Sequence, residues 1–137
     1  MLVLVALVVA GCRGNADSGA GQPLSKREYI ERFNTQQRDA ARIFGELGTA
    51  TRDPKAAQTH LDDFDALIKG LKALDPPVVW AHEHAAMVRA LQQMRDSMAV
   101  IARAPASKRA VISTQVRLYT DAQRDFQAAV RRVNETR

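Results

Sequence analysis

Apolar residues recur along most of the chain at intervals of three and four, which is the spacing of one face of an α-helix. Four such segments follow one another after residue 24, separated by short stretches rich in glycine or proline. Connections of only a few residues force consecutive helices to run in opposite directions. The pattern therefore predicts an all-α fold, an up-down-up-down four-helix bundle over residues 25–137.

The first predicted helix begins at Ser25, which can form a capping box with Glu28. Its pattern ends near Gly48 and Thr49. Its expected core positions are Ile30, Phe33, Ala40, Phe44 and Leu47.

The second predicted helix begins at Asp53-Pro54, because aspartate is a good N-cap and proline suits the first helical position. It ends at Asp75-Pro76-Pro77, since a residue that precedes proline is disfavoured in a helix. Its expected core positions are Ala57, Leu61, Phe64, Leu67, Ile68, Leu71 and Leu74.

The third predicted helix has the most regular period, with core positions spaced alternately by four and three residues, as in a bundle seam. These positions are Trp80, His84, Met87, Leu91, Met94, Met98 and Ile101. A break at residues 103–106 precedes the last helix, which we expect Ser107 to cap. The expected inner face of that helix is Val111, Gln115, Leu118, Ala122, Phe126, Ala129 and Val133.

The N-terminal segment differs from the rest of the chain. Leu2–Val9 is an uninterrupted apolar run of eight residues, too short to span a bilayer and suited to the hydrophobic stretch of a secretory signal. It leads into Val9-Ala10-Gly11-Cys12, which resembles the bacterial lipobox, where the cysteine is acylated and becomes the mature N-terminus. No basic residue precedes the run, which departs from a usual signal. We predict a lipoprotein signal peptide over residues 1–11.

Cysteine usage agrees with lipid attachment. Cys12 is the only cysteine, so an intramolecular disulfide cannot form, and acylation gives this residue a role in an exported protein. Residues 12–24 contain several Gly, Ser, Asn and Asp residues and are predicted to be a flexible tether that follows the acylated cysteine. We therefore expect an extracytoplasmic protein held on the cell membrane by its N-terminal lipid.

Composition limits the classes of function. A chain of 137 residues with 46% hydrophobic residues forms one domain with a core. It contains no Gly-rich phosphate loop, no G-x-S-x-G elbow and no H-E-x-x-H motif. We therefore predict a non-enzyme without a cofactor.

Around the start of the first predicted helix lie Leu24-Ser25-Lys26, Glu28-Tyr29-Ile30 and Asn34, and a second group of residues lies around a double proline. This second group comprises Leu71, Leu74, Pro76-Pro77, His84, Met87-Val88 and Leu91. Together these residues resemble small envelope lipoproteins of actinobacteria over parts of the first three predicted helices. Many such lipoproteins carry a cysteine in the first helix, where this chain has Gln36 and Gln37. The resemblance implies a helical domain in the cell envelope and no particular activity.

A metal site is the first candidate chemistry. His82 and His84 lie about 200° apart on a helix, so one ion cannot easily bridge them. His84 shares a face with Met87, Met94 and Met98, and imidazole with thioethers is a soft ligand set that suits Cu(I). Methionine also fills irregular gaps in cores, and the sequence favours that interpretation. A copper chaperone or sensor remains the alternative function.

Charged residues provide two further candidates. His60, Asp62, Asp63 and Asp65 form an acidic patch early in the second helix, which we attribute to the helix dipole. Residues 103–137 carry a net charge of +5, equal to the formal charge of the whole chain.

Within this basic region, Arg117, Arg124 and Arg131 are spaced by seven and form one stripe, which Asp121 can partly neutralise. The stripe is a candidate contact for anionic lipid head groups, with a solvated face as the alternative. An exported lipoprotein does not meet nucleic acid, and no aromatic residues alternate with these arginines. The sequence therefore predicts a binding or scaffolding module of the bacterial cell envelope whose partner is an envelope protein or the membrane itself.

Overall fold

The computed structural model describes residues 22–46 and 54–136, with the side chains of residues 54 and 55 excepted. Over these ranges the chain is helical and contains no β-strand. The elements are α1 (Lys26–Gly45), α3 (Pro54–Lys72), the 3-10 helix η1 (Val78–Trp80), α4 (Ala81–Arg103) and α5 (Arg109–Glu135). The predicted signal peptide, the lipobox and most of the tether lie outside the described residues.

The helix boundaries follow local sequence signals, with one exception. The capping box at the start of α1 is confirmed, since Ser25 Oγ accepts from the backbone N–H of Glu28 and the Glu28 carboxylate accepts from the Ser25 N–H. α3 begins at Pro54, as expected. The predicted cap at Ser107 is wrong: Lys108 occupies the N-cap position and makes no side-chain cap hydrogen bond. The reason is a turn closed by a bond from the Lys108 N–H to the Pro105 carbonyl, which places Ser107 before the helix.

α1 ends at Gly45, earlier than its pattern suggested, whereas Gly48, Thr49 and the predicted cap Asp53 lie outside the described residues.

The core positions predicted for α3 and α4 are confirmed, since all of them are buried. α1 buries Phe33 and Ala40 as expected, whereas Ile30 and Phe44 are half-buried. Leu47, the fifth position expected in that helix, lies outside the described residues.

α5 departs most from its predicted face. Ala122, Phe126, Ala129 and Val133 are buried, but Val111 is 42% exposed and residues 109–118 include no buried side chain. The expected positions Gln115 and Leu118 are half-buried. The start of α5 therefore lies beyond the packed core. Tyr29, Ile43, Tyr119 and Val130 are buried and were not predicted.

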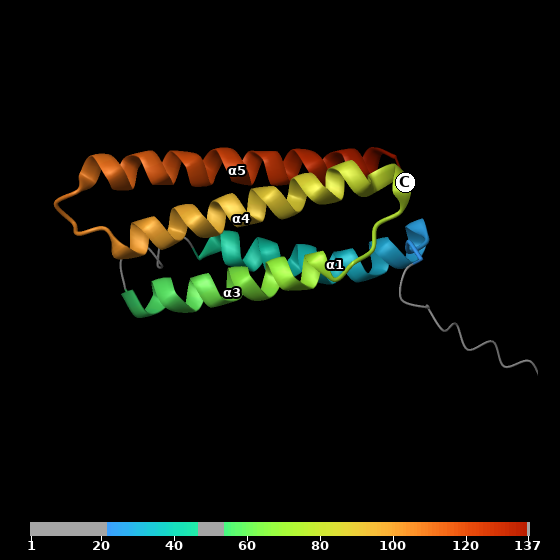
Figure 1. Ribbon diagram of the computed structural model, residues 1–137, viewed down its shortest axis with the longest axis horizontal. Helices are drawn as coiled ribbons and strands as arrows, with labels where there is room; N and C mark the ends of the chain where they lie inside the picture. Colours follow the sequence, from blue (N-terminus) through green and yellow to red (C-terminus); the bar gives the residue numbers. More distant parts are fainter. Residues whose placement is uncertain (1–21, 47–53, 137) are drawn as a thin grey trace, which may run out of the picture.

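One end of the molecule brings together the start of α1, the end of α3, the start of α4 and the end of α5. The Leu24 N–H donates to the Asp75 carbonyl over 3.0 Å, and Lys26 Nζ donates to the Thr136 carbonyl over 2.8 Å. Trp80 Nε1 donates to Thr136 Oγ1 over 2.8 Å. Figure 1 shows the four helices lying along the long axis of the molecule, with the C-terminus at this same end.

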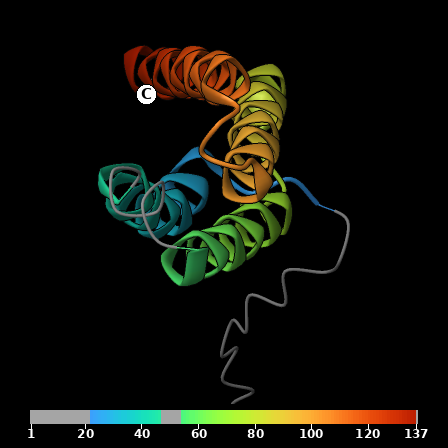
Figure 2. The same ribbon diagram turned by 90° about the vertical axis from the view of Figure 1, so that its left-hand side faces the viewer.

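Packing between the helices is uneven. The most extensive packing joins α4 to α5, followed by α3 with α4 and then α1 with α3. In the end view of Figure 2, α4 adjoins both α3 and α5, whereas α1 and α5 lie apart along one flank of the molecule. Where α1 approaches α3, a side chain at Gly70 would bring its Cβ within 2.6 Å of Gln36 Oε1, so the glycine leaves room for that amide.

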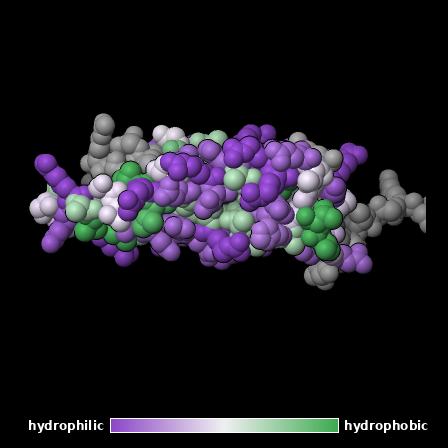
Figure 3. All heavy atoms as spheres, turned by 90° about the horizontal axis from the view of Figure 1, so that it is seen from above, coloured by the Kyte–Doolittle hydropathy of each residue, from purple (hydrophilic) through white to green (hydrophobic). Residues whose placement is uncertain are grey.

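Within the described residues, no helix is long and apolar enough to cross a membrane. Figure 3 shows hydrophilic side chains over most of the face seen from above, and hydrophobic side chains gathered mainly toward the two ends.

Candidate functional site

A groove of about 640 Å³ runs along the flank between α1 and α5. Its volume is within the range of small-molecule sites. Its apolar lining comes from Ala40, Ala41 and Phe44 on α1 and from Phe126 and Val130 on α5. Gly45 and five polar side chains complete the lining, namely Gln37, Gln123, Gln127, Arg131 and Asn134. The groove therefore has an apolar floor and an amide-rich rim.

The groove has a different character at its two ends. Phe44 and Phe126 meet edge to face, with ring centroids 5.5 Å apart. Because α1 begins beside the end of α5, moving back along α1 from Phe44 corresponds to moving forward along α5 from Phe126. This places Gln37 at the level of Arg131 and Asn134. One end is thus aromatic, and the other carries the guanidinium.

Arg131 is the only charged residue among the described residues that line the groove. It belongs to the predicted arginine stripe, and all three members, Arg117, Arg124 and Arg131, are exposed on α5. Arg124 pairs with Asp121 over 3.1 Å, so the expected partial neutralisation is confirmed. Arg131 therefore lies at the edge of the groove. Arg124 and Arg117 follow at intervals of seven residues toward the start of α5.

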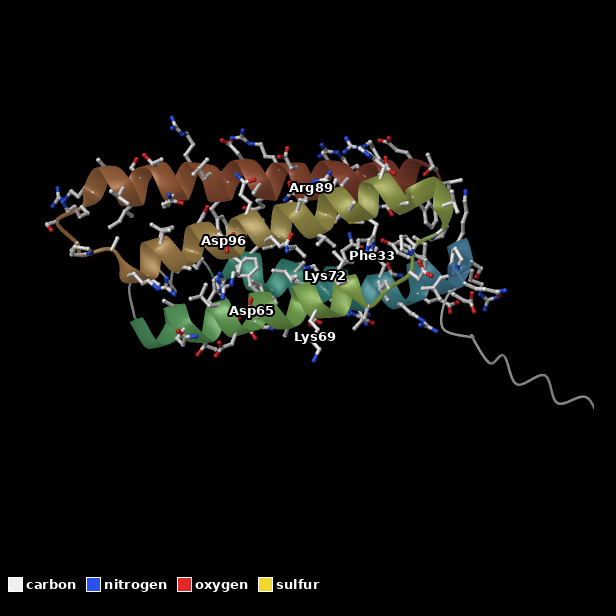
Figure 4. The ribbon with its side chains drawn as sticks, viewed as in Figure 1. Phe33, Asp65, Lys69, Lys72, Arg89 and Asp96 are labelled. Atoms are coloured by element: carbon white, nitrogen blue, oxygen red, sulfur yellow. The ribbon has the colours of Figure 1, made fainter. Side chains whose placement is uncertain are left out.

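A second cleft, of about 460 Å³, lies between α3 and α4 and has a balanced charge. Arg95 binds Asp65 through two nitrogens at 3.0 and 3.1 Å and approaches Asp96 at 3.6 Å. Lys72 also lines this cleft, whereas Lys69 points away from α4 (Figure 4). Both carboxylates of this cleft therefore already have Arg95 as a cationic neighbour.

Two carboxylates of the acidic patch predicted on the second helix form ion pairs with neighbouring helices, and the patch is not a dipole effect. The first turn of α3 contains no acidic residue, so the explanation by the helix dipole is wrong. Asp63 instead binds Arg42 of α1 over 3.1 Å, and Asp65 binds Arg95 of α4. These carboxylates therefore connect neighbouring helices. Asp62 accepts a hydrogen bond from Gln58 one turn earlier.

His60 does not belong to this acidic surface, since it is only 2% exposed. Its ring lies edge-on to Phe64 at 5.1 Å, and Phe64 lies edge-on to Tyr119 at 6.0 Å. Neither His60 nitrogen has a hydrogen-bond partner in the described part of the chain, and the same is true of the Tyr119 hydroxyl. Burial lowers the pKa of His60 and raises the pKa of Tyr119, which favours the neutral form of both groups.

The predicted His–Met face lies inside the core. His84 Nδ1 is 2.9 Å from the hydroxyl of Tyr29, and burial is the main cause that lowers the pKa of His84. Met87, Met94 and Met98 have no exposed surface.

The spacing of this face also argues against one shared ion. The rise of 1.5 Å per residue separates Met87 from Met98 by about 16 Å along α4, so one ion cannot contact both. His82 is exposed and lies apart from buried His84, as their spacing predicted. No group of three or more His, Cys, Asp or Glu residues suited to a metal occurs among the described residues.

Tyr29 and Tyr119 are the buried residues of most interest that the sequence did not predict. Each lies one position from an apolar residue that fitted the helical spacing, Ile30 and Leu118, and those two are only half-buried. The residue type could have indicated their burial, because a tyrosine carries a large apolar ring that is stabilised by burial. The partner of Tyr29 could not be predicted, since His84 is 55 residues away.

No protein-family model matches the chain, and neither a curated protein nor a solved structure shows significant similarity to it.

Proposed function

We propose that this chain is a lipid-anchored, extracytoplasmic binding module of a bacterial cell envelope, of the actinobacterial type. The motif Val9-Ala10-Gly11-Cys12 supports the anchor, and the similarity of the first three helices to small actinobacterial lipoproteins supports the location. Its role is to bind rather than to catalyse. The described clefts support this, since the α1–α5 groove is lined partly by apolar side chains and both carboxylates in the α3–α4 cleft pair with Arg95.

We also propose that the helices form an up-down-up-down bundle. The shared end described above supports this topology, because it gathers two helix starts and two helix ends. The two tight connections, residues 73–80 and 104–108, are short enough to require reversal of the chain.

The observation that carries the binding role is the α1–α5 groove. A groove with an apolar floor and a single guanidinium at one end matches an amphiphile with an apolar chain and an anionic head. Arginine binds a carboxylate through two parallel hydrogen bonds. We therefore assign a fatty acid to the groove, with its carboxylate at Arg131 and its chain toward Phe44 and Phe126.

The anchor is tested by labelling with radioactive palmitate and by membrane fractionation. We expect the label to follow the protein and Cys12→Ala to release it from the membrane fraction. Fractionation that does not change in this variant would contradict the anchor.

Binding in the groove is tested by titrating the full chain that carries Cys12→Ala with a fluorescent fatty acid. Ala41 lines the groove on an exposed part of α1, so Ala41→Trp should fill the groove and abolish saturable binding. Ala110→Trp is the matched control, since Ala110 is exposed on α5 away from the groove. Equal binding by both variants would place the acyl chain elsewhere, for example on Leu2–Val9.

The head-group contact is tested by a second pair of variants. Arg131→Gln should weaken binding about tenfold, as expected for the loss of a hydrogen bond to a charged group. Arg117→Gln removes the same charge from the stripe outside the groove and should leave binding unchanged. If the two variants weaken binding equally, general charge and not the groove attracts the ligand.

A further inference from the structure

Val78 and Val79 are the most exposed of the large hydrophobic residues in the described part of the chain. These two residues are 81% and 65% exposed. Single exposed apolar residues are common on protein surfaces and need no explanation. Two adjacent ones, on a turn held in one conformation, form a small apolar projection.

The turn is fixed by residues on either side of the pair. Pro77 and Trp80 are both buried, and the Trp80 N–H donates to the Pro77 carbonyl over 2.8 Å. In a 3-10 helix, residues three apart lie on the same side, so burying Pro77 and Trp80 turns the two valines outward. The Trp80 indole is held further by its bond to Thr136. The projection is therefore rigid.

The projection lies close to the point where the N-terminal part of the chain joins the helices. The Leu24 N–H binds the carbonyl of Asp75, which is three residues before Val78. Leu24 is itself buried against the core, which fixes this junction. Eleven residues separate Leu24 from Cys12. If Cys12 is lipidated as proposed, this short tether holds the end of the molecule that contains Val78 and Val79 near the lipid surface.

We infer that the Val78–Val79 turn contacts the lipid surface to which Cys12 anchors the chain, and that it orients the helices with this end toward the membrane. This inference rests on the proposed lipid anchor. The acyl chains retain the protein at the surface, and the valines select which face of the molecule meets the lipid.

The charges at this end favour an apolar contact over one with anionic head groups. Arg27 pairs with Glu31 at 2.9 Å, and Arg132 approaches Glu83 at 3.8 Å. Lys26 donates to the carbonyl of Thr136 and lies 5.1 Å from the centre of the Trp80 ring. Because Glu31 and Glu83 offset the charges of Arg27 and Arg132, the contact should depend little on anionic lipid. The arginine stripe on α5 would require such lipid instead.

An environment-sensitive dye tests this orientation in the lipidated full chain. Because acylation occupies Cys12, a new cysteine at position 79 is the only free thiol, and Val79→Cys can be labelled there with a nitrobenzoxadiazole dye. The matched control is Val111→Cys, an exposed valine at the start of α5. Both proteins are inserted into vesicles of phosphatidylcholine alone and of phosphatidylcholine with phosphatidylglycerol.

We expect brighter, blue-shifted emission for the dye at position 79 in both kinds of vesicle, and emission as in water at position 111. Adding Val78→Asp to the labelled Val79→Cys protein should remove much of the shift. Emission as in water at position 79 would overturn the inference, and so would a shift at position 111 that requires phosphatidylglycerol. Flotation with the vesicles is measured first, so that failure of the anchor is distinguished from failure of the orientation.

Discussion

Two clusters in this molecule bury the same kinds of side chain, but only one of them provides hydrogen-bond partners. The Tyr29 cluster consists of the buried residues Tyr29, Trp80 and His84 together with exposed Thr136, and the His60 cluster consists of the buried residues His60, Phe64 and Tyr119. In the Tyr29 cluster, the tyrosine hydroxyl meets the histidine Nδ1 at 2.9 Å and the indole N–H meets Thr136. In the His60 cluster, the described residues offer no partner to the histidine nitrogens or to the tyrosine hydroxyl.

Buried polar groups with a hydrogen-bond partner stabilise the fold, whereas buried polar groups without one destabilise it. A buried hydrogen bond adds about 0.5–1.5 kcal/mol to stability, whereas a buried group without a partner costs about 1–3 kcal/mol. The bond between Tyr29 and His84 therefore links α1 directly to α4. In the His60 cluster, apolar atoms could replace the polar atoms, and no hydrogen bond to a described residue would be lost.

The largest effect should come from the apolar core that both clusters adjoin. Leu91 has no exposed surface, and Leu91→Ala should cost about 2–5 kcal/mol because it removes buried area and leaves a cavity. A thermal or denaturant melt of the monomeric chain measures this loss. A midpoint that does not change would mean that the α4 seam is a docking surface and not the core.

The comparison itself is tested by removing one hydroxyl from each cluster. Tyr29→Phe should cost about 1–3 kcal/mol, because it leaves His84 Nδ1 buried without its partner. Tyr119→Phe should change stability by less than about 0.5 kcal/mol or raise it, because no hydrogen bond to a described residue is lost. Denaturant melts of the two variants give both values. Equal losses would show that the two clusters are equivalent.

Acid should weaken both clusters through their histidines. Burial lowers the pKa of His60 and of His84 below the ordinary value of 6.5, against the opposing influence of Glu46 and Asp63 on His60 and of Asp75 on His84. The unfolded chain therefore binds protons first as the pH falls, so this stability is fully present above pH 6.5 and decreases below it. Each histidine contributes a slope of at most about 1.4 kcal/mol per pH unit.

Melts between pH 7.5 and 5 measure this slope. His60→Gln should reduce the slope and leave the contribution of His84. If the variant has the slope of the unmodified chain, His60 does not titrate in this range.

The smallest effect should come from a surface pair outside both clusters. Arg124 is 73% exposed where it pairs with Asp121, and exposed ion pairs contribute little because water and salt screen them. Arg124→Ala should change stability by less than about 0.5 kcal/mol in a melt at moderate salt. A larger loss would mean that the exposed stripe takes part in the fold.

The sequence predicts the parts of this fold that depend on local order. The regular spacing from Trp80 to Ile101 identifies a buried face without any knowledge of its neighbours, and the capping box at Ser25 is likewise local. Features set by distant partners were not predictable, such as the bond between Tyr29 and His84 or the pair Asp65–Arg95. The α1–α5 groove belongs to this second class, because it exists only where two helices fail to close on one another.

The uneven packing of the helices has a kinetic consequence. α4 and α5 share the largest interface and are joined by only residues 104–108, so this hairpin has low contact order and should form early in folding. α1 and α5 are the most distant helices in sequence, so the groove between them is completed only when α1 docks. A ligand that occupies the groove would therefore act on the last step of folding, and would slow the release of α1 more than it speeds the formation of the α4–α5 hairpin.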